Sequence, residues 1–320
     1  MGEILKVEGL TKQFTKKNLF GSKLSTVKAV EDVTFSLHDD QVLVIAGESG
    51  SGKSTIAKLI LRAITPDSGK VVFDGEEISD NADSIMKIRM NCQMVHQDPY
   101  DSINPRMKVK DIVSEPLEIH NVGDNQEREK IVLNALREVK LEPAEEIANK
   151  YPHMLSGGQR QRIVLARALV VRPKIIIADE PVSMLDVSIR AEILELMKNI
   201  QKKNNISFIY ITHDLATARY FGQKIIILYL GKIMESGSIN QVLLEPKHPY
   251  TQALIDAISE PDPDNLYKEK IIRINEPRDI DFYSGCRFRA RCPYAIEKCV
   301  DVPTLETRDG RNGACFVDIT

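Results

Sequence analysis

Gly47-Glu-Ser-Gly-Ser-Gly-Lys-Ser-Thr55 is the stretch of this sequence that decides its fold. It has the pattern G-x-x-x-x-G-K-S, which predicts a loop that binds nucleotide phosphates. Glycines let the backbone turn tightly enough for its N–H groups to point at phosphate oxygens. Lys53 would supply a charge for the β- and γ-phosphates, and Ser54 a hydroxyl for Mg²⁺. The predicted binding residues of the loop are Gly47, Ser49, Gly50, Ser51, Gly52, Lys53, Ser54 and Thr55.

The sequence on both sides of this loop supports the same interpretation. Val42–Ala46 is a short apolar run that predicts a strand leading into the loop. Behind the loop, apolar residues recur with the spacing of one helix face, at Ile56, Leu59, Ile60 and Ala63. Such a helix aims its positive end at bound phosphates. A Gly/Ser-rich turn before an ordinary helix is the alternative, and the combination of strand, loop and helix argues against it.

Length and charge narrow the class of protein. The 320 residues suffice for one large domain with an appendage, or for two domains. With 43 basic and 46 acidic side chains, the net charge of −3 argues against a protein that binds nucleic acid over a broad surface. The first residues lack the apolar core of a signal peptide, and no apolar run approaches the length of a bilayer span. We therefore expect a cytoplasmic chain that associates with a membrane only through a partner.

A second candidate anion site lies at Ser156-Gly-Gly-Gln159, before a helix expected over residues 159–171. The hydroxyl of Ser156 and the N–H groups of Gly157 and Gly158 suit an anion at a helix start. The alternative is a simple helix cap with a flexible glycine pair. Because Ser-Gly-Gly is a common sequence, this stretch needs support from other motifs.

The run Lys174-Ile-Ile-Ile-Ala-Asp-Glu-Pro181 provides that support. Its consecutive apolar residues predict a strand that is buried on both faces, as in a parallel sheet. We expect Asp179, at the strand tip, to reach Mg²⁺ through the water shell of the ion, and Glu180 to polarise the attacking water. Two solvated carboxylates in a turn are the alternative, which a fully apolar strand downstream of a phosphate loop disfavours.

Two further side chains are expected at strand ends beside these carboxylates. A buried strand at residues 206–211 leads to His213, which at the carboxyl edge of a parallel sheet would face the ligand and hold the γ-phosphate. A strand at residues 91–96 leads to Gln97, whose amide could order a Mg²⁺-bound or attacking water. A lone histidine is usually structural, so only its place beside the other strand ends favours a catalytic role.

The remaining segments of the chain differ in the secondary structure that their residues favour. Residues 1–40 contain short β-like runs, which predict strands, with a polar loop at residues 15–26. Phe14 precedes that loop, and it could stack on adenine or pack in the core. Residues 107–155 read as helices, which predicts a helical insertion into the α/β core over about residues 98–158.

In this order and spacing, the motifs resemble those of an ATP-binding-cassette (ABC) ATPase. They are Gly47–Thr55, Gln97, Leu155-Ser-Gly-Gly-Gln159, Ile175–Glu180, Ser183-Met-Leu-Asp186 and His213. The likeness covers about residues 1–245. Further stretches are similar to the ATPase subunits of oligopeptide/dipeptide importers, namely Gln97-Asp-Pro-Tyr-Asp-Ser-Ile-Asn-Pro-Arg106, Lys247-His-Pro-Tyr-Thr251 and a cysteine-bearing extension over residues 246–320.

The resemblance implies an α/β P-loop ATPase core with an antiparallel β subdomain, a helical insertion subdomain and a C-terminal extension. It also implies a sandwich of two cassettes, in which the motif Ser156–Gln159 of one subunit contacts the γ-phosphate held by Lys53 of the other. Asp186 would lie at the seam of this dimer. The expected reaction is hydrolysis of ATP to ADP and phosphate with Mg²⁺, where Ser54, Gln97 and Asp179 lie near the ion.

The resemblance further implies the partners of the chain. A second cassette, identical or paralogous, would complete the dimer, and two transmembrane permease subunits would dock on the loop after Gln97 and on the helical insertion. An extracytoplasmic solute-binding protein would take part indirectly, and nucleic acid would not. The chain would lie peripherally on the cytoplasmic face of the cell membrane. Its cargo is set by other subunits, so the sequence leaves the solute open.

Four cysteines crowd into the C-terminal part with the spacing C-x5-C-x6-C-x15-C, at Cys286, Cys292, Cys299 and Cys315. Zinc sites usually pair cysteines at the closer C-x2-4-C spacing, and structural disulfides are rare in cytoplasmic proteins. An iron–sulfur cluster, a zinc ion and free or disulfide-forming thiols stay open as alternatives. The importer ATPases carry a similar cysteine set, which resembles the ligands of a [4Fe–4S] cluster. Arginines among these cysteines could contact nucleic acid, offset a negative cluster or form a solvated face.

The function that we predict is an ATP-hydrolysing subunit that powers the import of oligopeptides, dipeptides or related solutes through a permease. A soluble ABC ATPase whose iron–sulfur module acts on nucleic acid or ribosomes is one alternative, although such proteins usually carry two cassettes in one chain. A regulatory or redox-sensing module, in which hydrolysis is secondary, is another.

Overall fold

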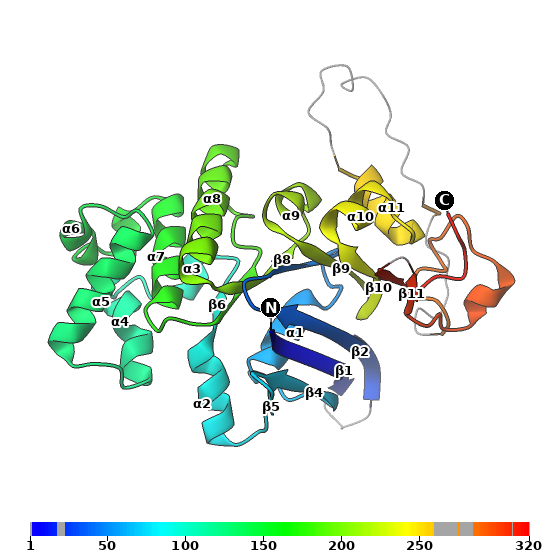
Figure 1. Ribbon diagram of the computed structural model, residues 1–320, viewed down its shortest axis with the longest axis horizontal. Helices are drawn as coiled ribbons and strands as arrows, with labels where there is room; N and C mark the ends of the chain where they lie inside the picture. The colour runs from blue at the N-terminus through cyan, green and yellow to red at the C-terminus, as the bar shows by residue number, and fades with distance from the viewer. Residues whose placement is uncertain (1, 18–22, 259–273, 276–283, 309, 320) are drawn as a thin grey trace, which may run out of the picture.

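The computed structural model describes residues 2–17, 23–258, 274–275, 284–308 and 310–319 (Figure 1). An eight-stranded sheet forms the centre of this described part. Its strands run in the order β11 (Glu306–Arg308), β12 (Arg311–Gly313), β10 (Lys232–Ser238), β9 (Lys224–Tyr229), β3 (Val42–Ala46), β8 (Ser207–Thr212), β7 (Ile175–Asp179) and β6 (Cys92–Val95). Neighbours from β9 to β6 are parallel, and those from β9 to β11 are antiparallel.

The middle of this sheet confirms the strands expected from apolar runs. Every residue of β3, β7 and β8 is buried, because helices or the second sheet cover both faces. A hairpin around Gly231 joins β9 to β10, which pair as antiparallel neighbours, and Gly231 has a positive φ of 82°. The carboxyl ends of β6, β7 and β8 lie along one edge, which places the residues that follow them side by side.

A second, antiparallel sheet confirms the expected β subdomain. Its order is β2 (Lys23–His38), β1 (Glu3–Lys17), β4 (Ser68–Phe73) and β5 (Glu76–Glu77). The polar loop expected at residues 15–26 is shorter than predicted, because both long strands extend into it and Thr15 pairs with Thr26. Residues 18–22 lie outside the described part. One apolar cluster joins this sheet to the central one through α1 (Lys53–Ile60), which lies between them.

The helices between β6 and β7 lie together at one side of the molecule and supply the expected helical segment: α3 (Pro99–Ser102), α4 (Val109–Ile119), α5 (Asn125–Glu138), α6 (Ala144–Ala148), the 3-10 helix η1 (Pro152–Met154) and α7 (Gly157–Leu169) (Figure 1). The later helices are α8 (Val187–Asn204), α9 (Leu215–Phe221), α10 (Ile239–Leu244), α11 (Pro249–Asp256) and the 3-10 helix η3 (Glu297–Val300). The helix α2 (Ala82–Asn91) was not expected, and neither were α9, α10 and α11; Asn81 caps α2 by accepting the Ser84 N–H.

The described residues after position 245 pack against the ATP-site core of the molecule rather than apart from it. Its strand β12 extends the central sheet by pairing with β10, where Glu235 lies opposite Gly313. Cys286, Phe288 and Cys292 belong to the same apolar cluster as the central strands. Within the described ranges, no helix combines the length and the apolar character that a membrane span requires.

Candidate active site

The phosphate loop adopts a backbone that only glycine permits at two positions. Gly47 and Gly52 have φ angles of 155° and 106°. A Cβ atom at Gly47 would lie 2.1 Å from the Leu228 carbonyl oxygen, and one at Gly52 would lie 2.2 Å from that of Ala29. Gly52 also begins α1 without a side-chain cap, so the N–H groups of the first turn are open to an anionic ligand.

Lys53 lies inside this loop and is almost fully buried. Its Nζ donates to the carbonyl oxygens of Gly47, at 2.8 Å, and Glu48, at 2.9 Å. Burial lowers the pKa of Lys53, while the carboxylates of Glu180 and Asp179 oppose this shift. The ammonium group thus sits among loop carbonyls and carboxylates, where it can meet the phosphates of a nucleotide.

Asp179 and Ser54 form the oxygen-rich part of the site. Asp179 ends β7 with 8% of its surface exposed. Burial raises the pKa of its carboxyl group, and hydrogen bonding to Ser54 and the charge of Lys53 act in the opposite direction. A hydroxyl and a carboxylate in contact are hard oxygen ligands of the kind that Mg²⁺ prefers, so this pair fits the ion.

Glu180 is held by two of the other predicted residues. Its Oε2 accepts a hydrogen bond from Gln97 Nε2 at 3.1 Å, and its Oε1 lies 3.0 Å from His213 Nδ1. Its backbone has a positive φ of 47°, which is strained for a residue other than glycine, and its N–H donates to the Ile211 carbonyl at 2.9 Å. Two residues that follow β6 and β8 therefore converge on the carboxylate of the residue that follows β7, the strand between them.

The second anion site begins α7, two residues earlier than expected. The Ser156 Oγ accepts the Gln159 N–H at 3.3 Å, and the Gln159 Oε1 accepts the Ser156 N–H at 3.0 Å, which makes a capping box. A Cβ at Gly158 would lie 2.7 Å from Ile189 Cγ2, so this glycine permits α7 and α8 to approach closely. Among the described residues, no hydrogen bond or ion pair joins this motif to the phosphate loop of the same chain.

Phe14 lies on β1 and exposes 46% of its side chain. The interpretation of Phe14 as a core residue is therefore wrong. Val27 is its partner on β2, and the Lys12 Nζ lies 5.9 Å from the centre of its ring. An exposed ring beside a cation is available for stacking.

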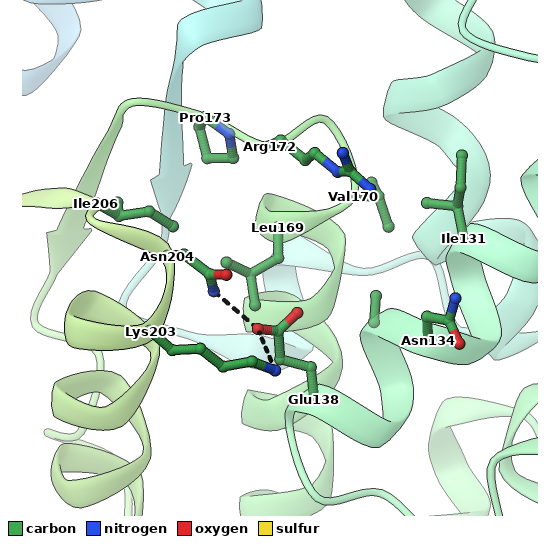
Figure 2. A pocket seen from close by; sticks show the side chains of 11 residues that line it. Ile131, Asn134, Glu138, Leu169, Val170, Arg172, Pro173, Lys203, Asn204 and Ile206 are labelled. Atoms are coloured by element: carbon green, nitrogen blue, oxygen red, sulfur yellow. Dashed lines mark hydrogen bonds and ion pairs between the residues drawn. The ribbon is translucent and has the colours of Figure 1, made fainter.

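A groove leads from the site to the helical segment. It has a volume of about 1090 Å³ and reaches from Ser54, Asp179 and Gln97 to Pro116 and Ile119 of α4. A separate cavity of about 360 Å³ lies between α5, the end of α7 and the end of α8 (Figure 2). There Glu138 accepts a hydrogen bond from Asn204 at 2.7 Å, and none of the predicted site residues lines the cavity.

The four C-terminal cysteines are free thiols that lie in one neighbourhood. Cys286, Cys292 and Cys299 are buried, Cys315 is half-buried, and the other three thiols lie near enough to Cys292 to help raise its pKa. Burial raises the pKa of Cys286 to about 11 and that of Cys292 to about 12. The disulfide alternative is therefore wrong for this structure. Within the described part of the chain, no three His, Cys, Asp or Glu side chains are placed to hold a single metal ion.

The arginines among these cysteines do not form a solvated face, contrary to one of the interpretations above. Arg287 is buried and pairs with Glu31 of β2. Arg291 makes two hydrogen bonds with the carboxylate of Glu48 in the phosphate loop. Sequence reasoning missed this pair, because neither residue belongs to a motif that predicts the other.

Comparisons with known proteins agree with this geometry. Residues 30–183 match the family model of the ABC transporter, and residues 234–299 match that of the oligopeptide/dipeptide transporter, C-terminal region. A probable peptide ABC transporter ATP-binding protein of Sinorhizobium fredii is 42% identical over 98% of this chain and 90% of its own length. The oligopeptide transport ATP-binding protein AppF of Bacillus subtilis is 40% identical over 92% of this chain and 91% of its own length.

A solved structure shares the fold of the core. It is the dimeric ATP-binding cassette MJ0796 in a post-hydrolysis state bound to ADP and Pi. It superposes with a TM-score of 0.65 at 31% sequence identity, and the alignment covers 74% of this chain and 99% of that chain.

Proposed function

This chain belongs to the ATP-binding cassette family of peptide-transporter ATPases, and we propose that it powers the import of oligopeptides or dipeptides through a membrane permease. It hydrolyses ATP to ADP and phosphate. One observation carries the proposal: Gln97 and His213 hold the Glu180 carboxylate beside a phosphate loop, in a chain that aligns over nearly its full length with peptide-transport ATPases.

The proposed roles of the residues follow from their chemistry. The Lys53 ammonium leaves its loop carbonyls to meet the β- and γ-phosphates of ATP, and the first N–H groups of α1 bind the same phosphates. Ser54, Asp179 and the amide oxygen of Gln97 would hold Mg²⁺. When bound, Mg²⁺ neutralises charge that develops on the phosphate oxygens.

The acid–base part of the mechanism rests on Glu180. Its carboxylate accepts a proton from the attacking water, which makes the water oxygen a better nucleophile. Gln97 and His213 fix the direction of this carboxylate, and the His213 side chain, 58% exposed, can also donate to the γ-phosphate. The strained backbone at Glu180 supports this role, because such strain clusters at active sites.

We propose that Ser156, Gly157, Gly158 and Gln159 act on the nucleotide of a partner cassette. The start of α7 presents open N–H groups, and its cap does not engage the phosphate loop of its own chain. In Figure 1, α7 lies with the other helices of the insertion, apart from α1. One chain thus offers one half of each of two sites, and Asp186, at the start of α8, would lie at the seam.

The proposed docking surface for the permease subunits is the groove between the Gln97 loop and α4. It is open and partly apolar, and Ile119 at its border exposes 57% of its side chain. The chain would therefore lie peripherally on the cytoplasmic face of the membrane. Phe14 remains the proposed adenine-stacking residue, since its ring is exposed at the edge of the antiparallel sheet.

We keep the [4Fe–4S] cluster as a proposal for the cysteine set. The support for it is the residue set itself, since four free thiols of the described part lie near one another. A single tetrahedral ion would need three or more ligands close together, which the described residues do not supply. Buried neutral thiols are stable alone, so a bound cluster would have to offset the cost of ionising them. We also propose that residue 245 divides the chain by role, with the ATPase before it and the cysteine set after it.

The first experiment is affinity purification of the Glu180→Gln variant from membranes, with ATP and without oxygen. We expect two multi-span permease subunits to copurify, with or without a second cassette. Wild-type chain without ATP is the control for nonspecific partners. Recovery from the soluble fraction with ribosomes or nucleic acid, and without a permease, would contradict the importer assignment.

A further inference from the structure

The C-terminal extension meets the phosphate loop at Glu48. The Arg291 NH1 lies 2.9 Å from Glu48 Oε2, and its NH2 lies 3.0 Å from Glu48 Oε1. Two parallel hydrogen bonds between a guanidinium and a carboxylate fix the orientation of the two groups as well as the distance between them. The side chains of Arg291 and Glu48 are 20% and 40% exposed, so the pair is only partly shielded from water.

A second contact holds the backbone of the same residue. The Glu48 N–H donates to the Tyr250 hydroxyl at 2.9 Å. Tyr250 lies on α11 with 1% of its surface exposed, and its ring packs against Tyr229 at 4.5 Å and Phe288 at 5.3 Å between ring centres. Residues after position 245 therefore hold Glu48 by both its carboxylate and its N–H group.

Glu48 in turn supports the residues that face the nucleotide. Its carbonyl oxygen accepts hydrogen bonds from Lys53 Nζ at 2.9 Å and from the Ser51 N–H at 3.2 Å. A shift of Glu48 would therefore move both the lysine and the turn of the loop. Nothing in the proposed mechanism assigns a nucleotide contact to the Glu48 side chain, which leaves its carboxylate to this pairing.

Arg291 is well placed to act as a fixed support. Its guanidinium lies over the rings of Phe288 and Tyr229, at 5.8 Å and 5.9 Å from their centres. Its carbonyl oxygen accepts the Asn275 N–H at 2.8 Å, and its own N–H donates to the Phe288 carbonyl at 2.9 Å. The backbone of Arg291 is thus anchored within the extension, and its side chain packs on one ring of the extension and one ring of β9.

We propose that the C-terminal extension positions the phosphate loop for nucleotide, with Arg291 as a positioning residue that acts through Glu48. This inference rests on the proposed ATP site. Loss of the pair leaves the loop free to sample other shapes, so nucleotide binding has to order it again. The cost appears in the Kd for nucleotide and in KM more than in kcat, because ground state and transition state use the same loop.

The test compares full-length Arg291→Gln, Glu48→Gln and the double variant. We expect each single variant to weaken binding of Mg²⁺–ADP about three- to fivefold, the range for a partly exposed ion pair, with little change in kcat. The double variant should bind no more weakly than either single one, since both remove the same interaction. Arg291→Lys, which keeps the charge but not the two-bond geometry, should fall between wild type and Arg291→Gln.

Arg289→Gln is the matched control. Arg289 lies two positions before Arg291, and within the described residues no hydrogen bond or ion pair of its guanidinium is found. Calorimetric Kd values of fully folded protein, taken with thermal unfolding midpoints, separate positioning from folding. A lower midpoint with an unchanged Kd, or single effects that add up in the double variant, would overturn the inference. If Arg291→Gln does not fold, Glu48→Gln alone decides the question.

The same binding measurements test the proposed ATP site separately from the positioning role of Arg291. If wild type fails to bind Mg²⁺–ADP, or if Lys53→Ala binds it as well as wild type, the ATP site itself is wrong. If wild type binds and Lys53→Ala does not, while Arg291→Gln equals wild type, only the positioning role fails.

Discussion

Glu180 and His213 face each other across the ends of two neighbouring strands, with 3.0 Å between Glu180 Oε1 and His213 Nδ1. Glu180 follows β7 and His213 follows β8, and the register of the two strands places Asp179 opposite Ile211. The parallel register, rather than any loop, therefore brings the carboxylate and the imidazole together. Because a sheet holds the ends of its strands at fixed positions, the placement of these two side chains is rigid. Such rigidity suits phosphoryl transfer, which the protein catalyses mainly by positioning the reacting groups.

Glu180→Gln should reduce ATP hydrolysis by about 100-fold or more, the usual effect of removing a general base. The amide keeps the shape of the side chain, so ATP binding should persist and the closed dimer should accumulate. Phosphate release and size-exclusion chromatography with ATP measure the two effects. Glu195→Gln, which changes an exposed carboxylate on α8, is the matched control. A rate of ATP hydrolysis by Glu180→Gln equal to that of wild type would show that Glu180 does not accept the proton of the attacking water.

Ser156→Arg, made in the Glu180→Gln background, should prevent the dimer that ATP would otherwise stabilise. The bulky cation would stand where the motif has to approach the γ-phosphate of the partner. Binding of ATP to the single chain should remain, because the motif does not contact the phosphate loop of its own chain. Chromatography with and without ATP measures the dimer, and equilibrium binding measures the nucleotide affinity.

The same substitution also removes a helix cap, which costs about 1 kcal/mol. Ser238→Arg is therefore the control, since Ser238 caps α10 by accepting the Gln241 N–H and belongs to no predicted site. Dimer formation by Ser156→Arg at wild-type ATP concentrations would contradict a site shared between two chains.

The stability of the fold should fall in mild acid because of His248. This side chain is 1% exposed, and burial lowers its pKa from the ordinary 6.5 to about 4. At pH values between these two pKa values, the His248 imidazole is mostly protonated in the unfolded chain and mostly neutral in the folded chain. The free energy of unfolding therefore decreases as the pH falls through this window, by about 3 kcal/mol in total from this group.

His248→Asn isolates this contribution. The His248 Nδ1 caps α11 by accepting the Tyr250 N–H at 3.0 Å, and asparagine keeps a capping acceptor but does not titrate. Urea unfolding at several pH values should show a steeper loss of stability in wild type than in the variant. Parallel pH profiles for the two proteins would show that His248 titrates normally in the folded state.

The cysteine set should carry iron and inorganic sulfide in protein purified without oxygen. A [4Fe–4S] cluster predicts about four of each per chain, with visible absorbance that reduction bleaches. Cys292→Ser should lose most of both, since its thiol neighbours the other three. Cys92→Ser is the control, because Cys92 is a buried thiol at the start of β6. Stoichiometric zinc, or no metal at all, would contradict the proposal.

Much of the core could be predicted because local signals and tertiary structure agree there. The run Ile175–Asp179 is apolar throughout, and a strand buried on both faces is the structure that uses such a run. The phosphate loop could be predicted from its glycines. Only glycine fits at Gly47 and Gly52, because a Cβ atom at either position would collide with a backbone carbonyl oxygen. The convergence of Gln97 and His213 on Glu180 followed from the rule that strand ends of a parallel sheet meet at one edge.

Other features depend on contacts that no local pattern encodes. The helix α2 has only one buried residue, Ile88, so its apolar periodicity is weak. Phe14 looks like a core residue by spacing, although its edge of the sheet is open. Arg291 and Glu48 are 243 residues apart, and their pairing depends on how the extension folds back over the loop. Spacing between cysteines could not separate a cluster from free thiols, because it does not fix distances between sulfur atoms.

The strand β12 has a consequence for solubility. It covers the outer side of β10, where Glu235 pairs with Gly313 and Ser236 with Asn312. A cassette truncated after residue 245 would expose these backbone donors and acceptors as an unprotected edge, which invites pairing between molecules. The C-terminal segment thus also acts as a built-in guard against aggregation, and recombinant versions of the ATPase core alone would need a substitute for it.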